Sequence, residues 1–225
     1  MISFQEVNIN FGTQDVLSGV SFKINQGERC GITGPNGAGK STIFNLISEE
    51  ISPQRGHVVF EGTKPTVGHL HQQLSKWNHD DTLLSYTLRA SRRLRELEHQ
   101  IHTIEKELPT DPQERNQALN RLGDLQTEFE HLGGYDIESR VKEALCGLGF
   151  KPDELERPFA EFSGGWKMRA EMIRTLVTEP DLLMLDEPSN YLDLPAVEWL
   201  QHYLRNYQGT LLLISHDRYL LRSLT

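Results

Sequence analysis

Three absences narrow the classes of protein that this sequence can encode. Its 225 residues hold only two cysteines, Cys30 and Cys146, which match no metal-ligand spacing, so we expect buried reduced thiols rather than a disulfide. No apolar run approaches the roughly 20 residues of a bilayer span. The N-terminal MISFQEVNIN lacks the basic and apolar regions of a signal peptide. We therefore expect a cytoplasmic protein without direct membrane insertion.

The composition is that of an ordinary folded protein with an acidic balance. Hydrophobic residues make up 37% and charged residues 24%, and the formal net charge is −9. This charge argues against a surface that coats nucleic acid, although it is compatible with a local basic patch. The length is enough for a well-buried core and allows either one large domain or one domain with an inserted segment, and we expect the second.

Apolar alternation and helical periodicity predict a mixed α/β domain. Short strand patterns occupy residues 2–25, in ISFQEVNI and VLSGVSFKI on either side of the turn signal FGTQD. Another strand runs from Arg29 to Thr33, and the pattern becomes helical from Ser41. HVVFEG and PTVGHLHQQ are candidate strands, and a helix is capped at Asp136. DLLMLDEP and GTLLLISHD are apolar enough to be buried strands.

An inserted antiparallel hairpin of two helices is predicted between about residues 82 and 132. Apolar residues recur there at spacings of three and four, at Leu94, Leu97, Ile101, Ile104 and Leu108, and again at Ala118, Leu122, Leu125, Phe129 and Leu132. Asp111 and Pro112 fit the N-cap and first position of the second helix, with Glu114 as a capping-box acid. These residues form a narrow apolar stripe, or seam, along each helix. A seam this narrow favours a projecting arm, and packing on the domain is the alternative.

Phosphate chemistry is indicated by GPNGAGKST, which satisfies the P-loop pattern between a strand and a helix. Lys40 would bridge the β- and γ-phosphates, and the Ser41 hydroxyl would ligate Mg²⁺. The strand LLMLDE supplies Asp186 to orient Mg²⁺ and Glu187 to polarise an attacking water, with a solvated strand end as the alternative. The nucleotide-binding residues expected in this loop are Gly34, Pro35, Asn36, Gly37, Ala38, Gly39, Lys40, Ser41 and Thr42.

A second anion site is predicted at FSGGW. Ser163 precedes a helical run there, and Gly164 and Gly165 leave the approach free of side chains. Unpaired N–H groups and the helix dipole favour a phosphate at such a terminus. We therefore expect these three residues to bind a phosphate.

These motifs, in their order along the chain, resemble the ATP-binding cassette (ABC) ATPases. GPNGAGKST resembles Walker A, the glutamine of HLHQQ the Q-loop, FSGGW the signature, LLMLDEPSNYLD Walker B with the D-loop, and ISHD the His-switch. FSGGWKMR, PSNYLD and the inserted hairpin resemble the ABC-F subfamily, with departures at Ser189 and Tyr191. The resemblance implies an α/β P-loop cassette with a β-rich N-terminal subdomain, a parallel-sheet core, a helical subdomain and the inserted antiparallel hairpin.

The resemblance also implies roles for single residues. Gln72 would contact Mg²⁺ and the attacking water, with Gln73 as the competing register. His216 would contact the γ-phosphate, and a structural strand-end histidine is the alternative. Phe11 would stack on adenine, and a place in the core is the alternative. Asp193 would contact the opposite P-loop. The catalytic set is Glu187, Lys40, His216 and Gln72, and the metal-binding set is Ser41, Gln72 and Asp186.

The cofactors implied are ATP and Mg²⁺, and the partner implied is a second cassette. In the family the signature loop closes head to tail over a γ-phosphate held by another cassette, so one chain supplies half of each of two sites. The chain ends nine residues after His216, so we expect a fragment of a two-cassette protein. We divide it into residues 1–81 and 135–225, the two parts of the ATPase domain, and the arm 82–134.

The function implied is a soluble ATPase that acts on the ribosome, where its arm touches rRNA or tRNA. The ATP-binding subunit of a membrane transporter is the alternative, which shares the phosphate-site residues but predicts no long arm. A nucleotide-gated scaffold is another, which Glu187 and His216 argue against.

Two clusters of side chains have competing explanations. The basic residues near the base of the arm are either a solvated helix face, with Arg92 paired to Glu96, or an RNA contact; they are Arg89, Arg92, Arg93 and Arg95. No acid or thiol at a known ligand spacing completes the histidines His69, His71 and His79, so a metal site is not favoured there.

Overall fold

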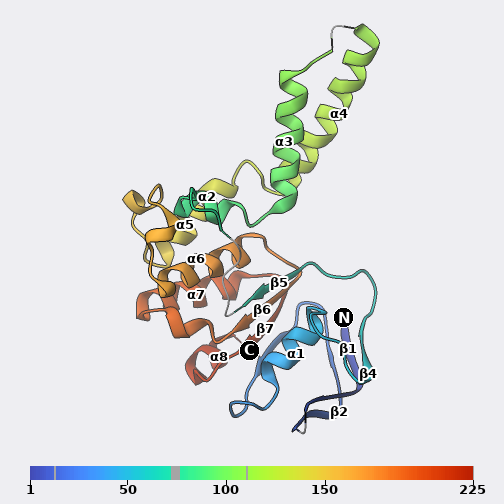
Figure 1. Ribbon diagram of the computed structural model, residues 1–225, viewed down its shortest axis with the longest axis vertical. Coiled ribbons are helices and arrows are strands. Elements are labelled where there is room, and N and C mark those ends of the chain that lie inside the picture. The colour runs from blue at the N-terminus through green and yellow to red at the C-terminus, as the bar shows by residue number, and fades with distance from the viewer. Residues whose placement is uncertain (13, 72–76, 110, 225) are drawn as a thin grey trace.

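An antiparallel sheet forms the N-terminal layer. The computed structural model describes residues 1–12, 14–71, 77–109 and 111–224 (Figure 1). The strands of this sheet run in the order β2-β1-β4, with bounds β1 Ile2–Phe11, β2 Gln14–Ile24 and β4 Arg55–Phe60. Both neighbours of β1 are antiparallel to it. The predicted strands of the β-rich N-terminal part are therefore present.

A parallel sheet lies at the centre of the domain. Its order is β3-β7-β6-β5, with bounds β3 Arg29–Ile32, β5 Val67–Leu70, β6 Leu182–Asp186 and β7 Thr210–Ile214. All three strand pairings are parallel. β7 is buried at every position, as continuous apolar runs covered on both faces require. Because the strands are parallel, their carboxyl ends meet at one edge, where ligands bind in open α/β sheets.

Helices cover both faces of the parallel sheet (Figure 1). The two faces of β6 and β7 belong to different cores: Met184 and Leu212 pack with α1 and the antiparallel sheet, whereas Leu183 and Leu211 pack with the helical layer. The helices have the bounds α1 Lys40–Ile47, α2 Leu83–Leu88, α5 Ile137–Gly147, α6 Gly164–Val177, α7 Leu194–Asn206 and α8 Arg218–Leu224. Short 3₁₀ turns span Pro152–Glu154, Phe159–Glu161 and Pro188–Tyr191.

The predicted hairpin consists of α3 (Arg92–Lys106) and α4 (Pro112–His131), which project from the rest of the domain (Figure 1). The carboxylate of Asp111 accepts hydrogen bonds from two backbone N–H groups of the first turn of α4, as its capping pattern predicts. Leu97 is fully buried in the seam. The seam is shorter than predicted, because α3 ends before Leu108, which is 37% exposed.

Two arginines of the basic cluster bind carboxylates of the same chain. Arg93 of α3 makes a forked contact with Glu128 of α4, with Nε–Oε1 and Nη2–Oε2 both at 2.7 Å. Arg89 pairs with the fully buried carboxylate of Asp81. The side chain of Arg92 lies outside the described part of the structure. Arg93 therefore stabilises the hairpin, and Arg89 stabilises its base.

The two cysteines differ from expectation. Cys30 is only partly buried and Cys146 is exposed, so the prediction of two buried thiols is wrong for Cys146. Cys146 lies near the C-terminal end of α5, a helix that buries its other face. Burial raises the pKa of the Cys30 thiol.

Among the described helices, none combines the length and apolar character needed to cross a bilayer.

Candidate nucleotide-binding site

The glycine-rich loop connects β3 to α1 and leaves the N-terminus of α1 without a capping side chain. Gly39, the N-cap residue, has φ 86°, a left-handed conformation that glycine adopts without strain. A Cβ at Gly39 would lie 2.7 Å from Cγ1 of Val16, so packing against β2 also requires glycine. Ala38 closes a turn by donating its N–H to the Pro35 carbonyl at 3.3 Å. The first N–H groups of α1 are thus available to an anion.

A cavity of about 430 Å³ lies against this loop, within the range of ligand pockets. It is lined by Phe11, Gln14, Val16, Asn36, Gly37, Gly39, Lys40, Ser41, Thr42, Asp186 and Glu187. Phe11 is 57% exposed, so the alternative that it belongs to the core is wrong. Sequence reasoning missed Gln14 and Val16, because nothing in the β2 pattern marks two strand residues as pocket walls.

The ammonium group of Lys40 lies within the loop. Its Nζ donates to the carbonyls of Gly34 at 2.9 Å and Pro35 at 3.0 Å. An ammonium has three donors, so at least one remains for a ligand. A positive charge and unpaired backbone donors on the same concave surface fit a polyphosphate.

Two oxygens suited to Mg²⁺ meet at the carboxyl end of β6. The Ser41 hydroxyl donates to Asp186 Oδ2 at 2.6 Å, although the residues are 145 positions apart. Hydroxyl and carboxylate oxygens are ligands that Mg²⁺ accepts beside phosphate and water. The donor set therefore fits the predicted Mg²⁺ site. Gln72 and Gln73 lie outside the described residues, so their role stays a prediction.

Glu187 and His216 are in contact beside the loop. The backbone N–H of His216 donates to Glu187 Oε2 at 3.2 Å, and His216 Nε2 lies 3.4 Å from Glu187 Oε1. The same Nε2 is 3.2 Å from Asn36 Oδ1. Glu187 has φ 49°, an uncommon conformation for a non-glycine residue that often marks functional sites. His216 is exposed, which disfavours a purely structural role.

The signature residues lie apart from this cavity. Ser163 caps α6 with its backbone only, and its side chain is exposed. A Cβ at Gly164 or Gly165 would meet no atom within 4 Å, so the approach is open. Among the described residues that line the phosphate-loop cavity, none comes from this loop. The signature terminus is therefore not part of the phosphate-loop cavity.

Arg169, which sequence reasoning missed, joins the signature helix to the loop before α7. Its Nε donates to the Tyr191 carbonyl at 2.8 Å, its Nη1 to the Leu148 carbonyl at 2.8 Å, and its Nη2 to Asp193 Oδ2 at 3.2 Å. Asp193 also caps α7 by accepting from the Ala196 N–H, and this bond and then Arg169 hold the pKa of its carboxyl low. The loop that ends at Asp193, the predicted D-loop, is thus held in place by α6, the helix that follows the signature residues.

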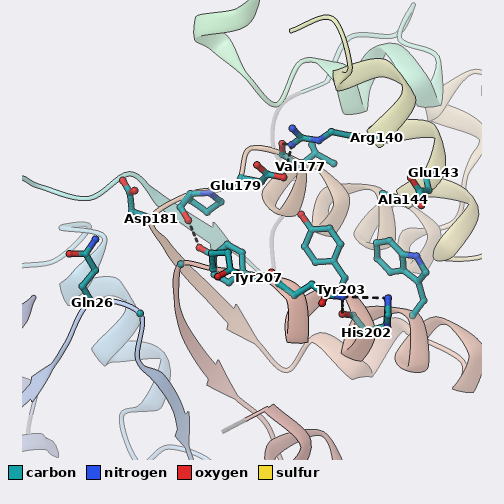
Figure 2. Close-up of a pocket in the computed structure, with 16 residues that line it drawn as sticks. Gln26, Arg140, Glu143, Ala144, Val177, Glu179, Asp181, His202, Tyr203 and Tyr207 are labelled. Carbon is teal, nitrogen blue, oxygen red and sulfur yellow. Dashed lines mark hydrogen bonds and ion pairs between the residues drawn. The ribbon is translucent and has the colours of Figure 1, made fainter. Parts of the chain in front are cut away.

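A second cavity, of about 680 Å³, is larger, and its lining includes Arg140 together with acidic side chains (Figure 2). Aromatic residues of α7 and its end line it, including Trp199, Tyr203 and Tyr207, and burial raises the pKa of Tyr203 to about 12. No described residue of the phosphate loop lines it. The larger cavity is therefore not the one at the phosphate loop, because Lys40 and the first residues of α1 line the smaller one.

The chain belongs to the ABC transporter family, whose model matches residues 17–190. It is an ATP-binding ABC ATPase cassette, as the P-loop and the parallel sheet indicate. Its fold resembles a dimeric bacterial ABC transporter cassette (TM-score 0.65, 20% identity, 99% of this chain and 91% of that chain). A post-hydrolysis cassette bound to ADP and Pi is similar as well, with TM-score 0.62, 18% identity and coverage of 99% and 91%. The predicted fold class is confirmed.

Among curated proteins, the chain is 39% identical over 224 residues to "Probable ATP-binding protein YheS" of Escherichia coli K12, covering 97% of this chain and 32% of that protein. It is 31% identical to ATP-binding protein Uup of Escherichia coli K12, covering 100% of this chain and 34% of that protein. These matches confirm the resemblance to the ABC-F subfamily. The chain spans about a third of the length of these relatives.

Proposed function

We propose that this cassette pairs head to tail with a second cassette and hydrolyses Mg-ATP at the interface. The observation that supports this proposal is that the two predicted phosphate-binding features lie apart. Lys40, Asp186 and Glu187 line one cavity, whereas the open signature terminus at Ser163 lies outside it. One chain therefore holds half of each of two sites. The dimeric cassette with a similar fold supports this arrangement.

Each residue of the cavity has a role that its position allows. Lys40 and the first N–H groups of α1 would bind the β- and γ-phosphates, and Ser41 with Asp186 would hold Mg²⁺. Bound Mg²⁺ would neutralise charge on the phosphate oxygens. Glu187 orients and deprotonates the attacking water, and His216, held between Glu187 and Asn36, donates to the γ-phosphate. Phe11, exposed at the rim, stacks on adenine.

Glu187→Gln tests this mechanism. It keeps the size of the side chain but removes the base, so turnover should fall by about 10²- to 10⁴-fold while ATP still binds. Phosphate release and nucleotide binding measure the two effects separately. Glu179→Gln is a matched control, since Glu179 also has a positive φ, of 45°, but lies outside the cavity. Unchanged turnover in Glu187→Gln would remove Glu187 from its role.

We propose further that the whole protein is cytoplasmic and acts on the ribosome, with the hairpin arm touching rRNA or tRNA. The support is the projecting pair α3 and α4 together with the ABC-F resemblance (Figure 1). Because Arg93 is engaged by Glu128, an RNA contact would use other side chains of the arm. The cycle requires that the ATP-closed and open states differ in ribosome affinity.

Sedimentation of the complete protein carrying Glu187→Gln with ribosomes tests this assignment. We expect co-pelleting that requires ATP and weakens with salt, as contacts to RNA phosphates do. A protein that binds ATP but does not pellet at either of two salt concentrations would refute the ribosome assignment, and it would favour a transporter subunit or a scaffold. Phosphate release from the wild type would still test ATP hydrolysis separately.

A further inference from the structure

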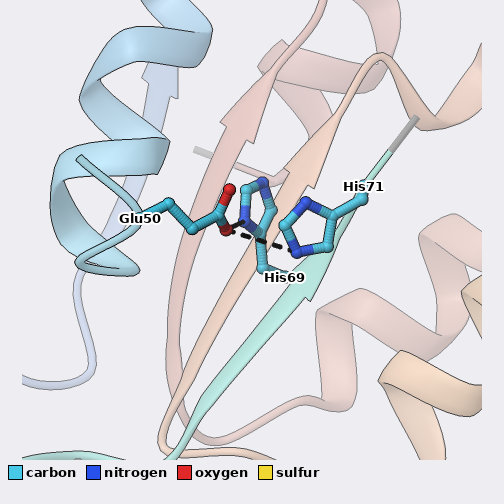
Figure 3. Close-up of side chains that lie close together, drawn as sticks. All are labelled: Glu50, His69 and His71. Carbon is cyan, nitrogen blue, oxygen red and sulfur yellow. Dashed lines mark ion pairs between the residues drawn. The ribbon is translucent and has the colours of Figure 1, made fainter. Parts of the chain in front are cut away.

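Two histidines and a glutamate converge beside α1, outside the set of groups assigned to ATP (Figure 3). Gly68 and Leu70 of β5 are buried in the sheet, and His69 and His71 alternate with them. His69 packs edge-on against Phe44 of α1, with ring centroids 5.5 Å apart. Glu50, from the bend that follows α1, approaches both imidazoles.

The distances between the three groups suit one metal ion. Glu50 Oε1 lies 3.5 Å from His69 Nδ1 and 3.5 Å from His71 Nε2. One ligand atom from each residue lies within 4.8 Å of the other two. Tetrahedral zinc, with bonds of about 2.0–2.1 Å, separates adjacent ligand atoms by about 3.3 Å. Small side-chain movements would therefore complete the coordination.

The chain holds the carboxylate in place without the histidines. The Glu50 N–H donates to the Asn45 carbonyl at 2.9 Å, and the Ser48 hydroxyl donates to Glu50 Oε1 at 2.8 Å. Hydrogen bonds of this kind orient metal ligands and strengthen binding. A carboxylate held in this way offers its remaining lone pairs to an ion.

His69 has a buried ring nitrogen that needs a partner. Its side chain is only 8% exposed, and Nδ1 makes no hydrogen bond to any described residue. Burial first, and then the neighbouring His71, lower its pKa to about 4 against the opposing effect of Glu50. An unpaired buried polar atom is costly, and a metal ion would satisfy it.

We propose that Glu50, His69 and His71 bind one divalent transition-metal ion, Zn²⁺ in preference to Mg²⁺. Two imidazole nitrogens and one carboxylate are a ligand set that zinc accepts, whereas Mg²⁺ prefers oxygen ligands alone. The side chains of His71 and Glu50 are 46% and 44% exposed, so the fourth position faces solvent. This ion is distinct from the Mg²⁺ that Ser41 and Asp186 would hold.

Calorimetric titration of the nucleotide-free, chelator-treated chain with ZnCl₂ in excess MgCl₂ tests the proposal. We expect one Zn²⁺ per chain. Glu50→Gln and His71→Gln should each weaken binding at least about 100-fold, because loss of outer-shell partners alone costs about 10- to 100-fold. His102→Gln, at an exposed position of α3, is the matched control and should bind as the wild type does.

Several results would overturn the proposal. One is that the wild type takes up no Zn²⁺, and another is that Glu50→Gln and His71→Gln each bind Zn²⁺ with the affinity of the wild type. Displacement of Zn²⁺ by Mg²⁺ would also contradict the site. Loss of binding in Cys146→Ser would place the ion on the exposed thiol. If a variant does not fold, NMR of the wild type decides. Zn²⁺ should shift the ring resonances of His69 and His71 but not those of His102, and the reverse pattern would contradict the site.

Discussion

Replacing Arg169 by Met tests how the signature helix is connected to the D-loop. The arginine is only 8% exposed, and Met fills much of its volume while removing every donor. The carbonyls of Leu148 and Tyr191, each 2.8 Å from the guanidinium, would lose their partners. A hydrogen bond from a charged donor contributes about 1.5–3 kcal/mol, so two give a loss of about 3–6 kcal/mol.

The bond to Asp193 adds little to this figure. The Asp193 side chain is 59% exposed, and ion pairs at exposed positions contribute little to stability. Asp193 also keeps its capping bond to the Ala196 N–H at 3.1 Å. The predicted loss therefore comes from the two carbonyls.

Urea unfolding of the wild type and of Arg169→Met without nucleotide, monitored by circular dichroism, measures the loss of stability. We expect a lower midpoint with an unchanged m-value, since the surface exposed on unfolding stays the same. Arg169→Lys should fall between the two, because an ammonium keeps the charge but cannot reach both carbonyls in the guanidinium geometry. A loss below about 1 kcal/mol in Arg169→Met would refute the reasoning, because it is less than one such bond.

Two further predictions concern the arm and the acid side of the stability curve. Leu97→Ala should cost about 2–5 kcal/mol within the arm, because Leu97 is fully buried there, and hydrogen exchange should accelerate in α3 and α4 while β6 and β7 keep their protection. The N–H and hydroxyl of Thr66 hold the pKa of Asp181 below its usual value, so its stabilisation is present above about pH 3.9 and is lost as pH falls through the lower folded pKa. Asp181→Asn should therefore lower stability at pH 7 and make it less dependent on pH below 4, which urea titrations at both ends can check.

Local patterns predicted most elements of the fold. The cap at Asp111, the helical spacing in the arm and the apolar runs of β6 and β7 each depend on neighbours within a few residues. Burial of single side chains was predicted less well. Cys146 is exposed and α3 ends before Leu108, because both outcomes depend on which elements pack nearby.

The chemistry of the phosphate loop can be predicted without coordinates, because GPNGAGKST carries its glycines, Lys40 and Ser41 within nine consecutive residues. The distant groups that join this loop depend on how the chain folds. Asn36 and His216 meet across 180 positions, and Glu50 completes the histidine pair that the sequence left without an acid. The parallel sheet brings strand ends together whatever their separation along the chain, and no local pattern records that geometry.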